Sequence, residues 1–146
     1  MAGSGRAWVL GLMLVVGCQS AFDLRPTEAN RTLGRSVLVR ATPAEALATA
    51  RDVAADLGLA VQEAGEGWFV AARPATAFSW GELIGVYTEG EGATTRVRVI
   101  FRRVLASNIT ATDFTGPMLE GLRAQLPSGE PNPWIRDPAR HNAWGP

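Results

Sequence analysis

The stretch "TPAEALATARDVAADLGL", residues 42–59, gives the clearest signal of local structure in the chain. Thr42 suits the N-cap of a helix, Pro43 suits the first helical position, and Glu45 completes a capping box with Thr42. Gly58 favours a left-handed C-cap, with Leu59 placed to pack back on the helix. Between the caps, apolar residues recur at helical spacing and form one stripe, made of Leu47, Ala50, Val53, Ala54 and Leu57. The stretch therefore predicts one amphipathic helix.

Alternating apolar and polar residues predict strands on both sides of this helix. Before it, "RSVLVRA" (35–41) is rich in β-branched residues. After it, two pairs of strands flank Gly-Glu-Gly turns, the first pair at about 59–64 and 67–73 and the second at 82–89 and 93–105. The stretch "DFTGPMLEGLRAQL" (113–126) again places apolar residues four apart, which predicts a second helix.

The predicted elements form a single small domain over residues 35–126, in the order strand, helix, four strands, helix. This order favours an α+β fold. We expect a two-layer sandwich, in which an antiparallel sheet of about five strands carries both helices on one face. Residues 18–34 show no sustained period and are interpreted as a tether. Residues 127–146 are dense in Pro, Gly and Asn, contain two Trp, and are interpreted as an extended tail.

Residues 1–17 have the features of a targeting segment. Arg6 precedes "AWVLGLMLVV" (7–16), an apolar run of about 10 residues that is shorter than the ~20 a spanning helix needs. The run ends in Val15-Val16-Gly17-Cys18, which resembles the lipobox of the bacterial lipoproteins. The resemblance implies that residues 1–17 are a signal peptide. It also implies that Cys18 becomes the first mature residue, with a diacylglycerol on its sulfur and a fatty acyl chain such as palmitate on its amine.

The same resemblance implies where the protein is located. Two or more acyl chains hold a protein stably on a bilayer, at about 0.8 kcal/mol per buried CH₂. Gln19, rather than Asp, follows the cysteine, which implies the outer membrane and its periplasmic face. The net charge of zero gives no field that would steer the protein toward nucleic acid. We therefore expect two partners, the membrane through the acyl chains on Cys18, and another protein of the cell envelope.

Few residues are available for catalysis or for metal binding. The chain has one cysteine, which the lipobox assigns to acylation, and one histidine, His141, in the predicted tail. Structural zinc takes four Cys or His ligands, and a Ser–His–Asp triad needs a histidine that the fold holds in place. The Gly-Glu-Gly turns lie between strands, whereas a phosphate-binding loop opens a helix. We therefore expect a non-catalytic protein without a cofactor or a resident metal.

The predicted strand at 93–105 offers one candidate binding surface. Arg96, Arg98 and Arg102 alternate with apolar residues there and share one face of the sheet. They form either a site for anionic lipid headgroups, glycan phosphates or an acidic partner, or a solvated face. In the second case they pair with Glu82 and with other carboxylates on neighbouring strands.

The tail offers a second candidate in Trp134, Ile135 and Trp144, which either anchor an interface or fold back on the domain. The function we expect is that of an accessory or scaffolding subunit that binds another envelope component. The alternative is a carrier that encloses a lipid or a glycan fragment between the helices and the sheet. A scaffold requires a filled core, whereas a carrier requires an enlarged apolar cavity. The Ala-rich helix favours close packing and hence a filled core.

Overall fold

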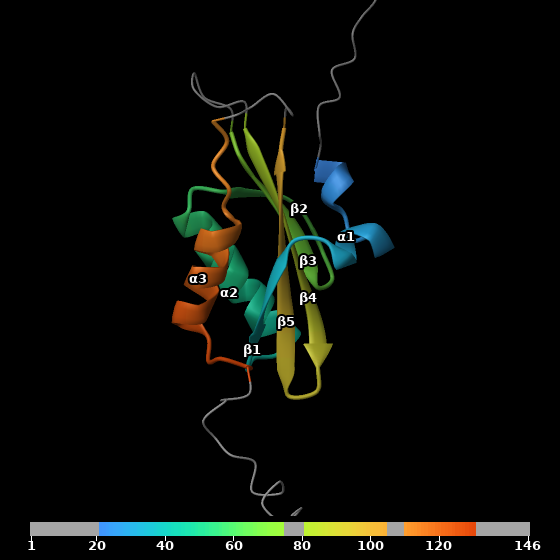
Figure 1. Cartoon of the computed structure of the whole chain (residues 1–146), viewed down its shortest axis with the longest axis vertical. Helices are drawn as coiled ribbons and strands as arrows, with labels where there is room; N and C mark the ends of the chain where they lie inside the picture. The colour runs from blue at the N-terminus through green and yellow to red at the C-terminus, as the bar shows by residue number, and fades with distance from the viewer. Residues whose placement is uncertain (1–20, 75–80, 105–109, 131–146) are drawn as a thin grey trace, which may run out of the picture.

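Two β-hairpins and one returning strand build a single sheet in the computed structural model, which describes residues 21–74, 81–104 and 110–130 (Figure 1). The strands are β1 (Arg35–Val39), β2 (Ala60–Gly65), β3 (Trp68–Arg73), β4 (Glu82–Glu91) and β5 (Thr94–Arg103). They lie in the order β1-β5-β4-β3-β2, and every neighbouring pair is antiparallel. The prediction of a five-stranded antiparallel sheet combined with helices is confirmed.

The two longer helices, α2 (Pro43–Asp56) and α3 (Thr115–Gln125), pack against each other and against the same face of the sheet (Figure 1). The start of α2 carries the expected capping box, since Thr42 Oγ1 accepts from the Glu45 amide at 3.2 Å and the Glu45 carboxylate accepts from the Thr42 amide at 2.9 Å. At its end Gly58 has φ 75°, and the amide of Leu59 donates to the carbonyl of Ala54 at 2.9 Å. These bonds satisfy backbone groups that the helix ends would otherwise leave without partners.

The main core lies between these helices and the sheet. Its largest fully buried side chains come from both layers and include Phe69, Ile84, Met118, Leu119 and Leu122. The helices approach closely at Gly121, where an added Cβ would lie 2.5 Å from Val53 Cγ1. The interface is thus filled by short and long side chains that match each other.

The opposite face of the sheet is partly covered by η1 (Ala21–Leu24) and α1 (Glu28–Thr32), which the sequence analysis missed (Figure 1). Leu24 is fully buried, and its carbonyl accepts from the Tyr87 hydroxyl at 2.5 Å. The Asn30 amide group donates to the carbonyls of Asp23 and Arg25 at 2.8 and 2.9 Å. The interpretation of residues 18–34 as a tether is therefore wrong from Ala21 onward, because Leu24 is buried against the sheet and the side chains of Tyr87 and Asn30 bond to the backbone of this segment.

The C-terminal boundary also lies further along than predicted. The Gly129 amide donates to the Leu38 carbonyl and the Arg40 amide to the Pro127 carbonyl, both at 2.8 Å. Ser128 forms an isolated antiparallel bridge with Val39. The prediction that the extended tail begins at residue 127 is wrong for residues 127–130, which lie along the outer edge of β1. The remaining predicted tail, 131–146, lies outside the described residues.

Candidate functional site

The three arginines of β5 share one face of the sheet, as the alternation predicts, and this face is the one opposite α2 and α3. Val97 and Val99 belong to the helix-side core, whereas Ile100 belongs to a second cluster under η1. That second cluster consists of Leu24, Val70, Leu83, Tyr87 and Ile100. The arginine face is therefore partly covered, and each arginine has different neighbours.

Arg96 is held by the hairpin that it belongs to. Its Nε and Nη2 donate to Glu91 Oε1 and Oε2 at 2.5 and 3.1 Å, and its Nη1 lies 3.4 Å from Ser36 Oγ. The hydrogen bonds from Arg96 lower the pKa of the Glu91 carboxyl, and those to Glu91 raise the pKa of Arg96. This bidentate pair uses the donors with which Arg96 would recognise an external anion.

Arg98 holds the chain that leads into β1. Its Nη1 donates to the carbonyl of Leu33 at 3.1 Å, so the guanidinium ties β5 to the end of α1. Its Nε is buried and meets no acceptor among the described residues. The position of Arg98 thus indicates a structural contact within the domain.

Arg102 lies beside a groove at the free edge of β5. Strand β1 pairs with β5 only as far as Arg35 and Val99, so the next residues of β5 have no neighbouring strand on that side within the described chain. Gly34 (φ 78°) lets the chain turn off there, since a Cβ would clash with the Val99 carbonyl oxygen. The hollow that results has a volume of about 380 Å³ and is lined by Leu33, Gly34, Arg35, Ile100, Phe101, Arg102, Asp113 and Thr115.

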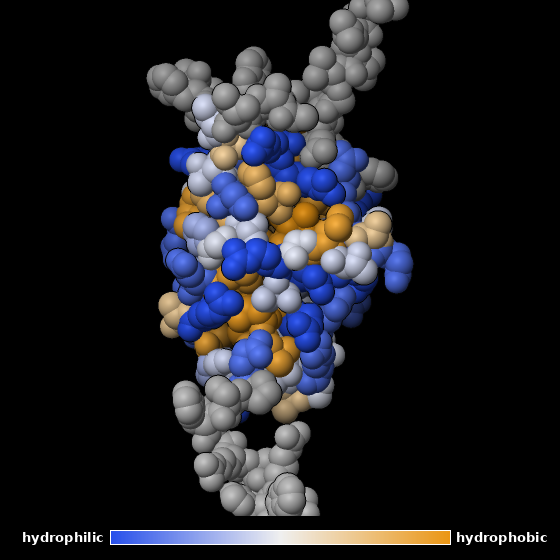
Figure 2. Space-filling view, in the orientation of Figure 1, coloured by the Kyte–Doolittle hydropathy of each residue, from blue (hydrophilic) through white to orange (hydrophobic). Residues whose placement is uncertain are grey.

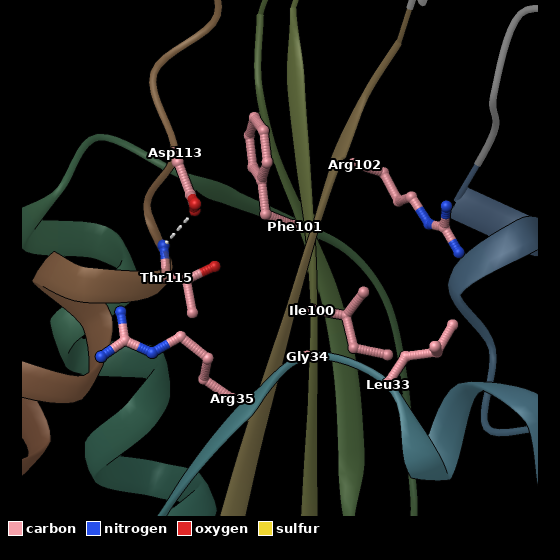
Figure 3. Close-up of a pocket in the computed structure, with 8 residues that line it drawn as sticks. All are labelled: Leu33, Gly34, Arg35, Ile100, Phe101, Arg102, Asp113 and Thr115. Carbon is pink, nitrogen blue, oxygen red and sulfur yellow. Dashed lines mark hydrogen bonds between the residues drawn. The ribbon is translucent and has the colours of Figure 1, made fainter.

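The groove combines apolar and charged walls (Figure 3). The side chains of Arg35, Phe101, Asp113 and Thr115 lie on one side of β5, and that of Arg102 lies on the other. Asp113 Oδ1 accepts from the Thr115 amide at 2.8 Å and so stabilises the start of α3. In the space-filling view of Figure 2, which has the orientation of Figure 1, apolar surface lies in the middle of the molecule and is bordered by hydrophilic residues.

An exposed strand edge of this kind can pair with an extended peptide, since its backbone N–H and C=O groups are free to form hydrogen bonds. Side-chain alternation on β5 would offer such a peptide an apolar contact at the partly exposed Phe101 and a charged contact at Arg102, whereas Ile100 is buried under η1. Arg102 was predicted from the alternation along β5, whereas Leu33, Gly34 and Arg35 were not, because they fell in the predicted tether or in a strand without a candidate site. A glycine just before a strand was the one signal that could have marked the turn.

Tyr87 connects the arginine face to η1. Burial raises the pKa of the Tyr87 hydroxyl to about 12, and the charges of Arg102 and Arg31 partly oppose that rise. The neutral hydroxyl is the form that donates to the Leu24 carbonyl. Tyr87 therefore holds η1 against the sheet.

Glu82 does not pair with the arginine face, so that part of the second reading of the arginines is wrong. The carboxylate is buried, and its Oε1 accepts from the Thr112 amide at 3.4 Å. In the register of the sheet, Glu82 lies between Arg73 and Arg103, on the helix side. In the hairpin register Arg102 lies opposite Leu83, so Glu82 and Arg102 are on opposite faces of the sheet.

Four of the candidate residues lie outside the described part of the chain. They are Cys18 and the tail residues Trp134, Ile135 and Trp144. Their roles stay predictions.

Two further hollows on the described surface bear on ligand binding. One of about 640 Å³ lies between the first turn of α2 and the β2–β3 turn, with Arg31, Glu66 and Thr88 among its lining residues. Another of about 360 Å³ surrounds the N-cap of α2 and the β4–β5 turn. Charged, hydroxyl and glycine residues contribute to both, in contrast to the mostly apolar lining that a lipid-sized ligand needs.

Within residues 21–74, 81–104 and 110–130, no helix is long and apolar enough to cross a membrane. The same stretches bring together no group of three or more His, Cys, Asp and Glu side chains that could hold a metal ion. No protein-family model matches the chain, and no curated protein sequence matches it either.

Proposed function

We propose that this chain is a lipoprotein of the cell envelope, acylated on Cys18 and anchored in the outer membrane on its periplasmic side. Its folded part would act as a non-catalytic accessory or scaffolding subunit that binds another envelope protein. We further propose a two-layer α+β sandwich as its fold, with η1 and α1 as an added partial cover. The packing of α2 and α3 on one face of the sheet supports that description.

The observation that supports a binding function is the combination of a filled core with an unpaired edge of β5 in the described chain. Phe69, Ile84 and Met118 are fully buried between the helices and the sheet, which leaves the space of a carrier's cavity occupied. The edge groove at Arg102, by contrast, offers backbone groups, apolar side chains and charge at the surface. This combination favours a binding subunit over the alternative of a carrier for a lipid or a glycan fragment.

The anchor is tested by mass spectrometry of the mature protein isolated from native envelopes. We expect the N-terminal peptide to begin at Cys18 and to carry a diacylglycerol and an N-acyl chain. An unmodified Cys18 in the mature protein would contradict the anchor.

The binding function is tested by crosslinking in native envelopes and identification of the captured protein. Three chains are compared: the full mature chain, a chain that ends at Glu130, and the full chain with Arg102→Glu. The cut follows Glu130 because residues 127–129 pair with β1. We expect a stoichiometric envelope protein that is lost with Arg102→Glu if the groove binds it, or with the truncation if the tail does. Recovery of a bound lipid with no protein partner would favour the carrier instead.

A further inference from the structure

The folded part of the protein begins three residues after Cys18. Helix η1 starts at Ala21, and Leu24 is fully buried with its carbonyl held by Tyr87. Three Cα–Cα steps of 3.8 Å span at most about 11 Å. An anchor at Cys18 therefore leaves almost no free chain, whereas a tether reaching to residue 34 would let the domain lie far from the bilayer in any orientation.

One end of the sheet lies close to the start of η1 (Figure 1). Arg73, Glu82 and Arg103 are register partners at that end of β3, β4 and β5. In Figure 1 the start of η1 lies nearer to this end than to the β4–β5 turn, and the described chain ends near the opposite end of the sheet. The β4–β5 turn at Gly92 lies at that opposite end as well.

We propose that the Arg73–Glu82–Arg103 end of the sheet faces the lipid surface and that the β4–β5 turn faces away from it. This inference rests on the acylation of Cys18. Arg73 and Arg103 are exposed at that end and Arg102 is partly exposed, so anionic headgroups would attract it. Asp113 is exposed near the groove and opposes this attraction in part, so the short connection supplies most of the orientation.

The proposed orientation also restricts the binding partner. The edge groove is formed by Ile100–Arg102, within about 10 Å of the lipid-facing end at ~3.3 Å per residue. A protein that pairs with this edge would therefore have to approach the membrane surface.

The test uses the full mature chain, attached through Cys18 to a diacyl maleimide lipid in vesicles of phosphatidylcholine and phosphatidylglycerol. The single cysteine makes this attachment selective. Because the lipid is synthetic, the result does not depend on whether cells acylate Cys18, which the mass measurement decides separately. The photo-crosslinking residue p-benzoylphenylalanine replaces Arg103 in one variant and Glu91 in the matched control. Both residues are exposed and lie at opposite ends of the β4–β5 ladder, about 30 Å apart.

We expect at least about tenfold more lipid adduct from Arg103→p-benzoylphenylalanine than from the Glu91 variant, since a separation of ~30 Å equals the thickness of a bilayer core. If the Arg103 variant does not fold, the same substitution at Arg73 probes the same end. Equal adducts, or more from the Glu91 site, would overturn the orientation. A flexible Gly/Ser linker inserted between Ser20 and Ala21 should remove the difference, and a difference that survives the linker would overturn the role of the short connection.

Discussion

The two faces of the sheet are covered by segments of different character. On one face, α2 and α3 have 14 and 11 residues, apolar stripes at helical spacing, and a core that reaches from β1 to β3. On the other face, η1 and α1 have 4 and 5 residues and no sustained period. They are held by the burial of Leu24, by one hydrogen bond from Tyr87 and by two from the Asn30 side chain. The first cover is encoded locally, whereas the second depends on partners far away in the sequence.

The largest effect should come from opening the helix-side core. Phe69→Ala removes a fully buried ring between α2 and the sheet, and we expect it to lower the free energy of unfolding by about 3–5 kcal/mol. Urea unfolding followed by circular dichroism measures this loss. Val61→Ala, at a position that is 44% exposed on β2, is the control and should change the stability by less than about 0.5 kcal/mol. Similar losses for both variants would contradict the assignment of the core.

The cover on the other face should contribute less. Leu24→Ala removes a fully buried side chain from a cluster of only five buried residues, and we expect a loss of about 2–3 kcal/mol, at the lower end for a buried leucine. Hydrogen exchange should show faster exchange in η1 and α1 with little change in α2. A loss below about 0.5 kcal/mol would mean that η1 does not belong to the folded unit.

The difference between the two covers, α2 and α3 on one face and η1 and α1 on the other, explains which parts of the fold the sequence could predict. The capping box at Thr42, the stop at Gly58 and the alternation along β5 are local, and each is found where the sequence predicts it. The segment from Ala21 to Leu33 has one local signal, the N-cap at Thr27 that accepts from the Asn30 amide, but no apolar period. Its contact with the sheet depends on a tyrosine hydroxyl 63 residues away from Leu24. Because the segment shows no sustained period, it was predicted to be part of a tether.

The same limit applies to the candidate site. Alternation correctly placed Arg96, Arg98 and Arg102 on one face, but it could not show that Arg96 pairs with Glu91 or that Arg98 bonds to the Leu33 carbonyl. Those contacts depend on the hairpin register and on the path of the chain before β1. The groove at Arg102 arises because β1 is shorter than β5, a property of strand pairing that single residues do not reveal.

The burial of the Tyr87 hydroxyl under η1 gives this side of the sheet its own pH dependence. The pKa of Tyr87 is raised from 10 to about 12 in the folded protein, so the fold favours the neutral hydroxyl. A pKa shift of that size corresponds to about 2–3 kcal/mol in the free energy of unfolding. This contribution is complete below pH 10 and is lost as the pH rises toward 12. The chain has one tyrosine and no lysine, so few other groups titrate in this range.

Tyr87→Phe is the matched variant for this titration. It leaves the Leu24 carbonyl without its donor, and we expect a loss of about 1–2 kcal/mol at neutral pH. Its stability should then vary little between pH 9.5 and 11.5, in contrast to the parent chain, as urea unfolding at several pH values would show. A Cys18→Ser background removes the thiol titration. Equal slopes for both proteins would mean that the hydroxyl is not buried against η1.

The smallest effect tests how closely the two long helices pack. A Cβ on Gly121 would lie 2.5 Å from Val53 Cγ1, whereas a Cβ on Gly116 would meet nothing within 4 Å. Both glycines lie in α3, so Ala gains helix propensity at each position, by up to about 1 kcal/mol. At Gly121 the clash should outweigh that gain and lower the stability by about 1 kcal/mol, because α2 has to move away. Gly116 precedes Pro117, whose ring disfavours helical backbone at a preceding residue that carries a Cβ, so Gly116→Ala should change the stability by less than about 0.5 kcal/mol. If Gly121→Ala stabilises the protein, α2 and α3 can move apart enough to accept the added Cβ. The packing of the two long helices would then be less tight than the 2.5 Å approach to Val53 indicates.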